Sequence, residues 1–222
     1  MSSQLLIVVI DGCALAYVNP QDTPCLFRLA EQGFFKVVHS AIPSVTNVNH
    51  ATILSGAFPE QHEVVGNYFY NRDTGEHGFI EDPHHMKMAT IIDRYQQAGR
   101  KTALLTVKGK VLEVFGKNAT IGINLQKTTP EQLASYDLPA PPDVNTLDTY
   151  DWIFQACYRV IEKEKPDLVY CTTNDYMMHN YRPEAPEAKT VMSTIDRWLG
   201  KIYDLDPTRE IYITADHGMN QK

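Results

Sequence analysis

Two kinds of segment alternate along the chain. Short runs rich in apolar residues predict strands at 5–10, 34–38, 102–107, 119–123, 167–172 and 210–214, and those at 5–10 and 102–107 have the pattern of strands buried on both faces. Between them, apolar residues spaced three and four apart predict amphipathic helices over 24–32, 87–98, 147–164 and 191–202. Strands that alternate with helices in this way predict an α/β fold with a mostly parallel central sheet flanked by helices.

Local signals mark where two of the helices begin. Thr23 and Pro24 fit the N-cap and the first helical position of helix 24–32, and Gly33 fits its end. Thr129, followed three residues later by Gln132, predicts a capping box before a further short helix.

Chain length and net charge limit the classes of protein to which the chain can belong. The 222 residues, 43% of them hydrophobic, are enough for one domain with a sizeable core. The formal net charge of −7 argues against nucleic acid or an anionic membrane surface as the main partner. No apolar run reaches the roughly 18–20 residues that a spanning helix needs. No segment predicts an oligomer interface, so an oligomer stays possible.

The N-terminal segment and the cysteines indicate a compartment. The segment MSSQLLIVVIDG has no basic residues before its short apolar run, which predicts no signal peptide. The four cysteines form no CxxC pair, so we expect free thiols in a reducing environment, and hence a cytoplasmic location.

Carboxylates follow three of the predicted strands. Asp11, Asp175 and Asp216 come at or just beyond strand ends, where ligands bind in open α/β sheets. Asp175 and His179 are four residues apart and would share a helical face, and His217 directly follows Asp216. Asp and His are good ligands for zinc and other divalent metals, so two such pairs suggest two metal ions.

Thr46 precedes a predicted helix over 49–55 and has two interpretations. It can be an ordinary N-cap, or, beside bound metal ions that lower its pKa, a nucleophile. His50 and His62 are interpreted as packing residues or as residues that position Thr46 and Asn67.

Five motifs occur in an order that resembles the alkaline phosphatase superfamily. They are Asp11, PSVTNVNHATILSG at 43–56, HEVVGN at 62–67, DYMMH at 175–179 and ADHGM at 215–219. The chain is most similar to the branch that contains the nucleotide pyrophosphatase/phosphodiesterases and phosphonoacetate hydrolase. The resemblance implies an alkaline phosphatase-like core and two divalent metal ions, with zinc as the first candidate and iron or manganese as alternatives.

The resemblance also implies roles for single residues. Thr46 would be the nucleophile, and Asn67 would hold a phosphoryl oxygen. One metal would be surrounded by Asp11, Thr46, Asp216 and His217, and the other would be bound by Asp175 and His179.

Lys108 and Lys110 bear on the substrate, which we expect to be a small phosphonate or phosphate ester. They follow the strand 102–107 and suit a second negative group beyond the phosphoryl centre, unless they are simply an exposed loop. They resemble the lysine pair with which phosphonoacetate hydrolase binds the carboxylate of its substrate. The expected reaction is therefore hydrolysis of phosphonoacetate to acetate and phosphate through a phosphothreonine. The alternatives are a nucleotide pyrophosphatase/phosphodiesterase on the same scaffold and an inactive fragment of such an enzyme.

The resemblance also sets an expectation about length. In this superfamily the second metal takes a further histidine from well downstream of the ADHG segment, but no histidine follows His217 here. We therefore expect residues 1–222 to be the N-terminal, C-terminally truncated part of a longer metallohydrolase core, without its cap and last metal ligand. Otherwise the second metal would be bound weakly.

Overall fold

The computed structural model describes residues 4–219. Residues 1–3 and 220–222 lie outside the described part. Two sequence predictions fall partly on these residues: the interpretation of the N-terminal segment as no signal peptide, and the expectation about the stretch after His217. The structure gives no account of those residues.

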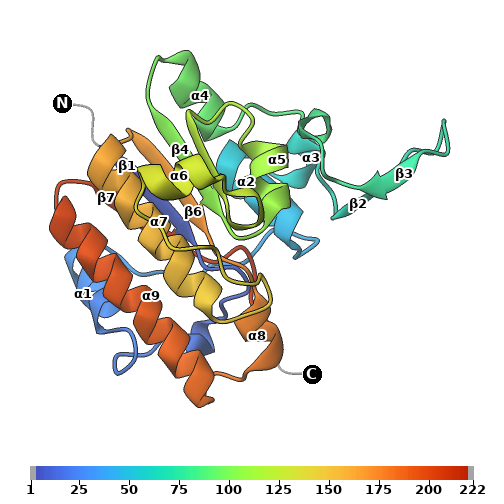
Figure 1. The fold of residues 1–222 in the computed structure, drawn as a ribbon. Coiled ribbons are helices and arrows are strands. Elements are labelled where there is room, and N and C mark those ends of the chain that lie inside the picture. The colour runs from blue at the N-terminus through green and yellow to red at the C-terminus, as the bar shows by residue number, and fades with distance from the viewer. Residues whose placement is uncertain (1–3, 220–222) are drawn as a thin grey trace.

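A five-stranded parallel sheet forms the centre of the molecule (Figure 1). Its strands stand in the order β5-β4-β6-β1-β7. Their bounds are β1 Leu5–Val9, β4 Thr102–Thr106, β5 Ile121–Asn124, β6 Leu168–Thr172 and β7 Glu210–Thr214. The α/β fold with a mostly parallel sheet is confirmed, as are five of the six predicted strands. A separate antiparallel hairpin consists of β2 Tyr68–Tyr70 and β3 His77–Phe79.

The connections between the strands are mostly helical. The α-helices are α1 Pro24–Gln32, α2 Thr46–Ser55, α3 Pro59–His62, α4 Ile91–Gln97, α5 Gly109–Phe115, α6 Pro130–Ser135, α7 Asp148–Glu164, α8 Tyr176–Asn180 and α9 Pro186–Leu205. Short 3-10 turns occur at Leu15–Tyr17, Pro83–His85 and Leu125–Lys127. Within the described residues, no helix combines the length and apolar character needed to cross a membrane.

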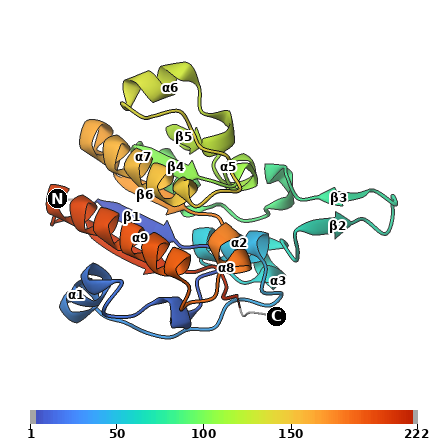
Figure 2. The ribbon, with the colours of Figure 1, turned by 60° about the horizontal axis from the view of Figure 1, so that its bottom comes forward.

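Helices cover both faces of the sheet, because alternate strand residues point to opposite faces. Helices α7 and α9 pack with Leu6, Val8 and Leu105 on one face. Helices α2, α4 and α5 pack with Val9 and Leu104 on the other. Helix α1 lies against α9, and the β2–β3 hairpin projects away from these layers (Figure 2).

The predicted strand at 34–38 is wrong. This segment forms no strand, and Phe34 and Val38 are 73% and 67% exposed. It lines a groove beside β7, whose described pairing is with β1. An apolar run becomes a strand only when a neighbouring strand takes up its backbone hydrogen bonds, and none of the described residues does so here.

Three helix starts and one helix cap differ from the expectation. Helix α2 begins at Thr46 rather than at residue 49, so Thr46 is its first residue and not its N-cap, and α9 begins at Pro186 rather than at residue 191. Helix α4 begins at Ile91 rather than at residue 87, because Thr90 and Asp93 form a capping box there. Thr23 is the N-cap residue of α1, but its side chain does not cap the helix. Instead, the carboxylate of Asp196 in α9 accepts hydrogen bonds from the N–H groups of Cys25 and Leu26. The capping box at Thr129 and Gln132 is confirmed.

Candidate active site

The register of the parallel strands places the predicted site residues at the same edge of the sheet. Val9 in β1 lies opposite both Thr172 in β6 and Thr214 in β7. Thr106 in β4 also lies opposite Thr172. Four neighbouring parallel strands therefore end together. Two or three residues further on, they deliver Lys108, Asp175, Asp11 and Asp216 to the carboxyl edge of the sheet.

The turn after β1 depends on a glycine. Gly12 adopts a φ of 74°, in the left-handed region that glycine adopts most easily. A β-carbon there would lie 3.1 Å from Cβ of Asp175. The Gly12 N–H donates to Oδ1 of Asp216 at 3.0 Å, and the His217 N–H donates to the same oxygen at 2.9 Å. These bonds fix Oδ1 of Asp216 and leave Oδ2 facing the site.

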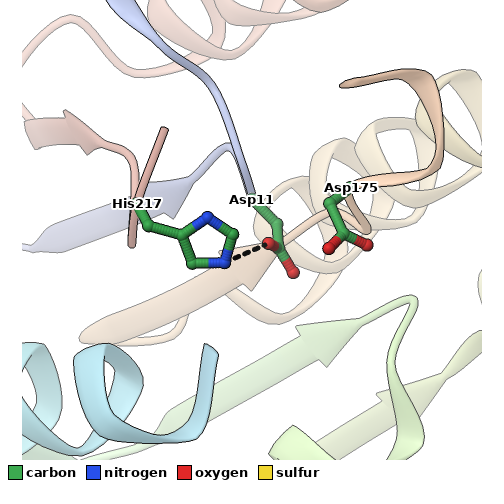
Figure 3. Close-up of side chains that lie close together, drawn as sticks. All are labelled: Asp11, Asp175 and His217. Atoms are coloured by element: carbon green, nitrogen blue, oxygen red, sulfur yellow. Dashed lines mark ion pairs between the residues drawn. The ribbon is translucent and has the colours of Figure 1, made fainter. Parts of the chain in front are cut away.

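Thr46 comes to the same site from a different segment of the chain. It is the first residue of α2, and its Oγ1 lies 3.5 Å from Nε2 of His217 and 3.5 Å from Nζ of Lys108. Nε2 of His217 also lies 3.6 Å from Oδ1 of Asp11 and 3.4 Å from Oδ2 of Asp216. Figure 3 shows the His217 ring turned toward the Asp11 carboxylate, with Asp175 beyond it.

These spacings fit a shared cation better than direct hydrogen bonds. Direct bonds are centred near 2.9 Å, whereas donors at about 2.0–2.2 Å from a tetrahedral zinc ion lie roughly 3.3–3.6 Å apart. Moreover, Oδ1 of Asp11 and Oδ2 of Asp216 are buried, with no hydrogen-bond donor among the described residues. Asp11, Thr46, Asp216 and His217 therefore fit the first predicted metal site by both donor type and spacing.

Burial makes the charge of Asp11 costly. Its side chain is fully buried, and this burial raises its pKa well above the ordinary value. The carboxylates of Asp216 and Asp175 raise the pKa further, while Lys108 opposes them. A carboxylate in this position needs a nearby cation to stay ionised at neutral pH.

Lys108 is one such cation. Its Nζ lies 2.6 Å from Oδ2 of Asp11 and 2.9 Å from Oδ1 of Asp175. Burial by itself lowers the pKa of Lys108, but the two carboxylates outweigh that effect and raise the pKa. The same ammonium group offsets the burial of Asp175, whose pKa is lowered.

The second predicted metal pair is assembled at α8. Asp175 precedes the helix, and His179 lies one turn further on, which brings Nε2 of His179 to 3.2 Å from Oδ2 of Asp175. The predicted i, i+4 contact is confirmed. A carboxylate oxygen of Asp175 also lies within 4.8 Å of possible ligand atoms of Asp11 and His217. The two predicted metal sites are thus neighbours, although binding at either of them stays a prediction.

Asn67 is oriented by the start of α2. The backbone N–H of Asn47 donates to Oδ1 of Asn67 at 3.1 Å. Because that bond fixes the amide oxygen, the amide NH2 of Asn67 remains free to donate. Asn47, the residue that follows the nucleophile candidate, thus orients the exposed side chain of Asn67.

Lys110 points to a different partner from Lys108. Its Nζ pairs with Glu81 at 2.8 Å and lies 4.3 Å from the centre of the Phe79 ring, on the projecting hairpin. Its side chain is 46% exposed. The structure therefore brings Lys108, but not Lys110, into contact with the carboxylates, and the predicted role of Lys110 in substrate binding stays a prediction.

His50 also belongs to this cluster, although its sequence position indicated only a packing or positioning role. Its ring is fully buried, and Nδ1 lies 2.5 Å from the hydroxyl of Tyr170 in β6. A ring nitrogen of His50 and carboxylate oxygens of Asp11 and Asp216 lie within 4.8 Å of one another. Burial lowers the pKa of His50 to about 4, so the ring is neutral at neutral pH. The four-residue spacing from Thr46 was the available signal, since it places both on one face of α2.

The fold is shared with alkaline phosphatase PafA, at 16% identity and a TM-score of 0.70, as the resemblance to the alkaline phosphatase superfamily predicts. More narrowly, the chain belongs to the type I phosphodiesterase / nucleotide pyrophosphatase family, whose model matches residues 5–222.

Solved structures and curated proteins agree with this assignment. Phosphonoacetate hydrolase from Sinorhizobium meliloti 1021, solved with phosphonoformate, is 31% identical with a TM-score of 0.89. That alignment covers 98% of this chain and 56% of the hydrolase. Human ectonucleotide pyrophosphatase/phosphodiesterase family member 7 is 27% identical over 98% of this chain and 48% of its own length. An uncharacterised pyrophosphatase/phosphodiesterase of Schizosaccharomyces pombe is 26% identical, over 98% and 45%.

The chain thus spans about half the length of the curated relatives that it matches.

Proposed function

We propose that the protein hydrolyses the carbon–phosphorus bond of phosphonoacetate, releasing acetate and phosphate. The observation that carries this proposal is the position of Lys108. Its ammonium group lies 3.5 Å from Oγ1 of Thr46, beside the candidate metal ligands. A cation so close to the nucleophile candidate suits a substrate that carries a carboxylate one carbon away from phosphorus. The resemblance to the Sinorhizobium meliloti hydrolase, also solved with phosphonoacetate, supports the same substrate.

Two divalent cations, with zinc as the first candidate, would be held by the two residue sets described above. They would supply positive charge that lowers the pKa of the Thr46 hydroxyl and offsets the charge of the phosphoryl oxygens.

The residues of the chain supply the remaining steps. The Thr46 hydroxyl loses its proton to solvent water, and its oxygen forms a bond to phosphorus while the phosphorus–carbon bond breaks; the electron pair stays on the departing carbon. Lys108 binds the carboxylate next to that carbon and stabilises the enolate, which takes a proton from water and leaves as acetate. The amide NH2 of Asn67 donates to a phosphoryl oxygen throughout. Water then cleaves the phosphothreonine, which releases phosphate and restores Thr46.

A second candidate is a nucleotide pyrophosphatase or phosphodiesterase activity. One observation favours it: the hairpin that follows Asn67 carries exposed aromatic rings at Tyr68, Tyr70 and Phe79. Such rings can stack on a nucleotide base. The names of several relatives point the same way.

Phosphate release separates the candidates. With zinc, iron(II) or manganese added in turn, we expect the chain to release phosphate from phosphonoacetate, and Thr46→Ala to abolish this release. Lys108→Ala should strongly lower kcat/KM for phosphonoacetate, whereas Lys117→Ala, which removes an exposed lysine just after α5, should not. Turnover of a nitrophenyl nucleotide ester with phosphonoacetate inert would replace the proposal by the second candidate. Turnover of neither would favour an inactive fragment.

A further inference from the structure

A buried histidine and tyrosine lie behind the candidate metal ligands, and the reaction proposed above does not use them. His50 is fully buried on α2 and Tyr170 is fully buried on β6. Their side chains meet at 2.5 Å between Nδ1 and the hydroxyl oxygen. They come from segments far apart in sequence, so only the packing of α2 on the sheet joins them.

Hydrogen-bond accounting assigns the tautomer of this ring. The Tyr170 hydroxyl has no other partner than His50 among the described residues. If the hydroxyl accepted a bond from Nδ1–H, its own proton would be buried without an acceptor, which is costly. The hydroxyl therefore donates to Nδ1. Because Nδ1 accepts this bond, it carries no proton, and the ring proton is on Nε2.

Nε2 has no partner of its own within the described residues. Nδ1 is engaged by Tyr170, so Nε2 is the nitrogen available to the neighbouring carboxylates. Those carboxylates belong to Asp11 and Asp216, which lie with His50 inside a 4.8 Å cluster. Oδ1 of Asp11 and Oδ2 of Asp216 are buried and have no hydrogen-bond donor in the part of the chain that the structure describes. A buried N–H group close to two carboxylates stabilises their charge, because the low dielectric of the protein interior strengthens the interaction.

We propose that His50 is a positioning residue for the metal site: Tyr170 holds it in the Nε2–H tautomer, and that N–H orients the carboxylates of Asp11 and Asp216 toward the cation. The proposal rests on the metal-binding part of the proposed function, but not on the identity of the substrate. It also makes His50 distinct from a direct ligand, because a ligating nitrogen cannot keep its proton.

Zinc affinity of the 222-residue chain, measured by competition with a chromophoric chelator, is the first test. We expect His50→Leu to weaken zinc binding by about 10–100-fold, the usual effect of removing a residue that orients a ligand. His50→Gln, whose amide can replace the Nε2–H donor, should recover part of the affinity. Tyr170→Phe should fall in between, because the ring stays but its tautomer is no longer set.

His62→Gln is the matched control. His62 is equally buried, but it contacts Thr52 and Val64 rather than the carboxylates, so its loss should leave zinc affinity unchanged. Circular dichroism and the urea midpoint without metal would report folding for each variant. Zinc binding by His50→Leu within about twofold of wild type would overturn the proposal.

Nitrogen-15 NMR of the wild-type imidazoles supplies a second test that needs no variant to fold. We expect His50 to be protonated at Nε2 both without and with zinc. Protonation at Nδ1 without zinc, or loss of the Nε2 proton on zinc binding, would each contradict the assigned role. A turnover assay tests the proposed substrate separately. If zinc binding depends on His50 but phosphonoacetate is not hydrolysed, the proposed substrate is rejected and this inference is kept.

Discussion

The ammonium group of Lys108 lies 2.6 Å from the fully buried carboxylate of Asp11. Removing one partner of a buried ion pair leaves the other charge uncompensated. Without added metal we therefore expect Lys108→Met to lower the free energy of unfolding by about 3 kcal/mol, at the lower end of the usual range because Lys108 remains partly exposed. Zinc should restore much of the loss, since it would supply positive charge to the same carboxylate. Urea unfolding with and without zinc measures both effects.

Lys110→Met is the control for that experiment. Lys110 is two residues away and forms an exposed ion pair with Glu81. Exposed pairs contribute little, so its loss should change the free energy of unfolding by less than about 1 kcal/mol. Equal effects of the two substitutions would show that the Lys108–Asp11 contact has no special importance.

Replacing Asn67 tests whether its oriented amide contributes to catalysis. Its oxygen is held by the N–H of Asn47, the residue that follows Thr46, which leaves the amide NH2 as a donor. We expect Asn67→Ala to reduce kcat by about 10²–10³-fold on whichever substrate turns over, with a smaller change in KM, as for other donors to a charged oxygen. Asn118→Ala removes an exposed asparagine that bonds Asp93 and should leave kcat unchanged. An Asn67 variant with wild-type kcat would remove Asn67 from the mechanism.

The burial of His62 predicts that the folded protein loses stability as the pH falls. Its side chain is buried, Nδ1 accepts a hydrogen bond from the Val64 N–H, and burial lowers its pKa below the ordinary 6.5. The unfolded chain therefore binds a proton at this residue before the folded chain does. The stability that depends on neutral His62 is present above pH 6.5 and decreases as the pH falls toward the folded-state pKa. In urea unfolding between pH 7.5 and 5, His62→Gln should lose less stability than wild type. Parallel curves would contradict the prediction.

The cap of α1 by Asp196 predicts a long-range effect on that helix. The Asp196 carboxylate accepts from the N–H groups of Cys25 and Leu26, although it belongs to α9. Asp196→Ala should lower the free energy of unfolding by about 2 kcal/mol, because two helix N–H groups lose a charged acceptor. Hydrogen exchange should speed up at residues 25–28. Asp204→Ala, an exposed aspartate on the same helix, should change neither quantity.

Much of the fold and of the site follows from local sequence. The apolar runs at β1, β4 and β6 are buried strands because they have no exposed polar face, whereas β7, for which only pairing with β1 is described, is partly exposed. Once the strands are known to be parallel, the aspartates that follow them must gather at one edge. The contact between Asp175 and His179 follows from helical spacing alone.

Tertiary structure decided what spacing cannot express. Segment 34–38 has the composition of a strand, but no neighbouring strand pairs with it among the described residues. Lys108 and Lys110 look equivalent in sequence, yet one faces Asp11 and the other faces Glu81, two residues after the hairpin. The pairing of His50 with Tyr170, 120 residues apart, depends on how α2 packs on the sheet. The sequence by itself determined which residue types reach the site, since local periodicity places them at strand ends and on helix faces. Only the packing of helices on the sheet determined their partners, because contacts between distant segments depend on register and burial.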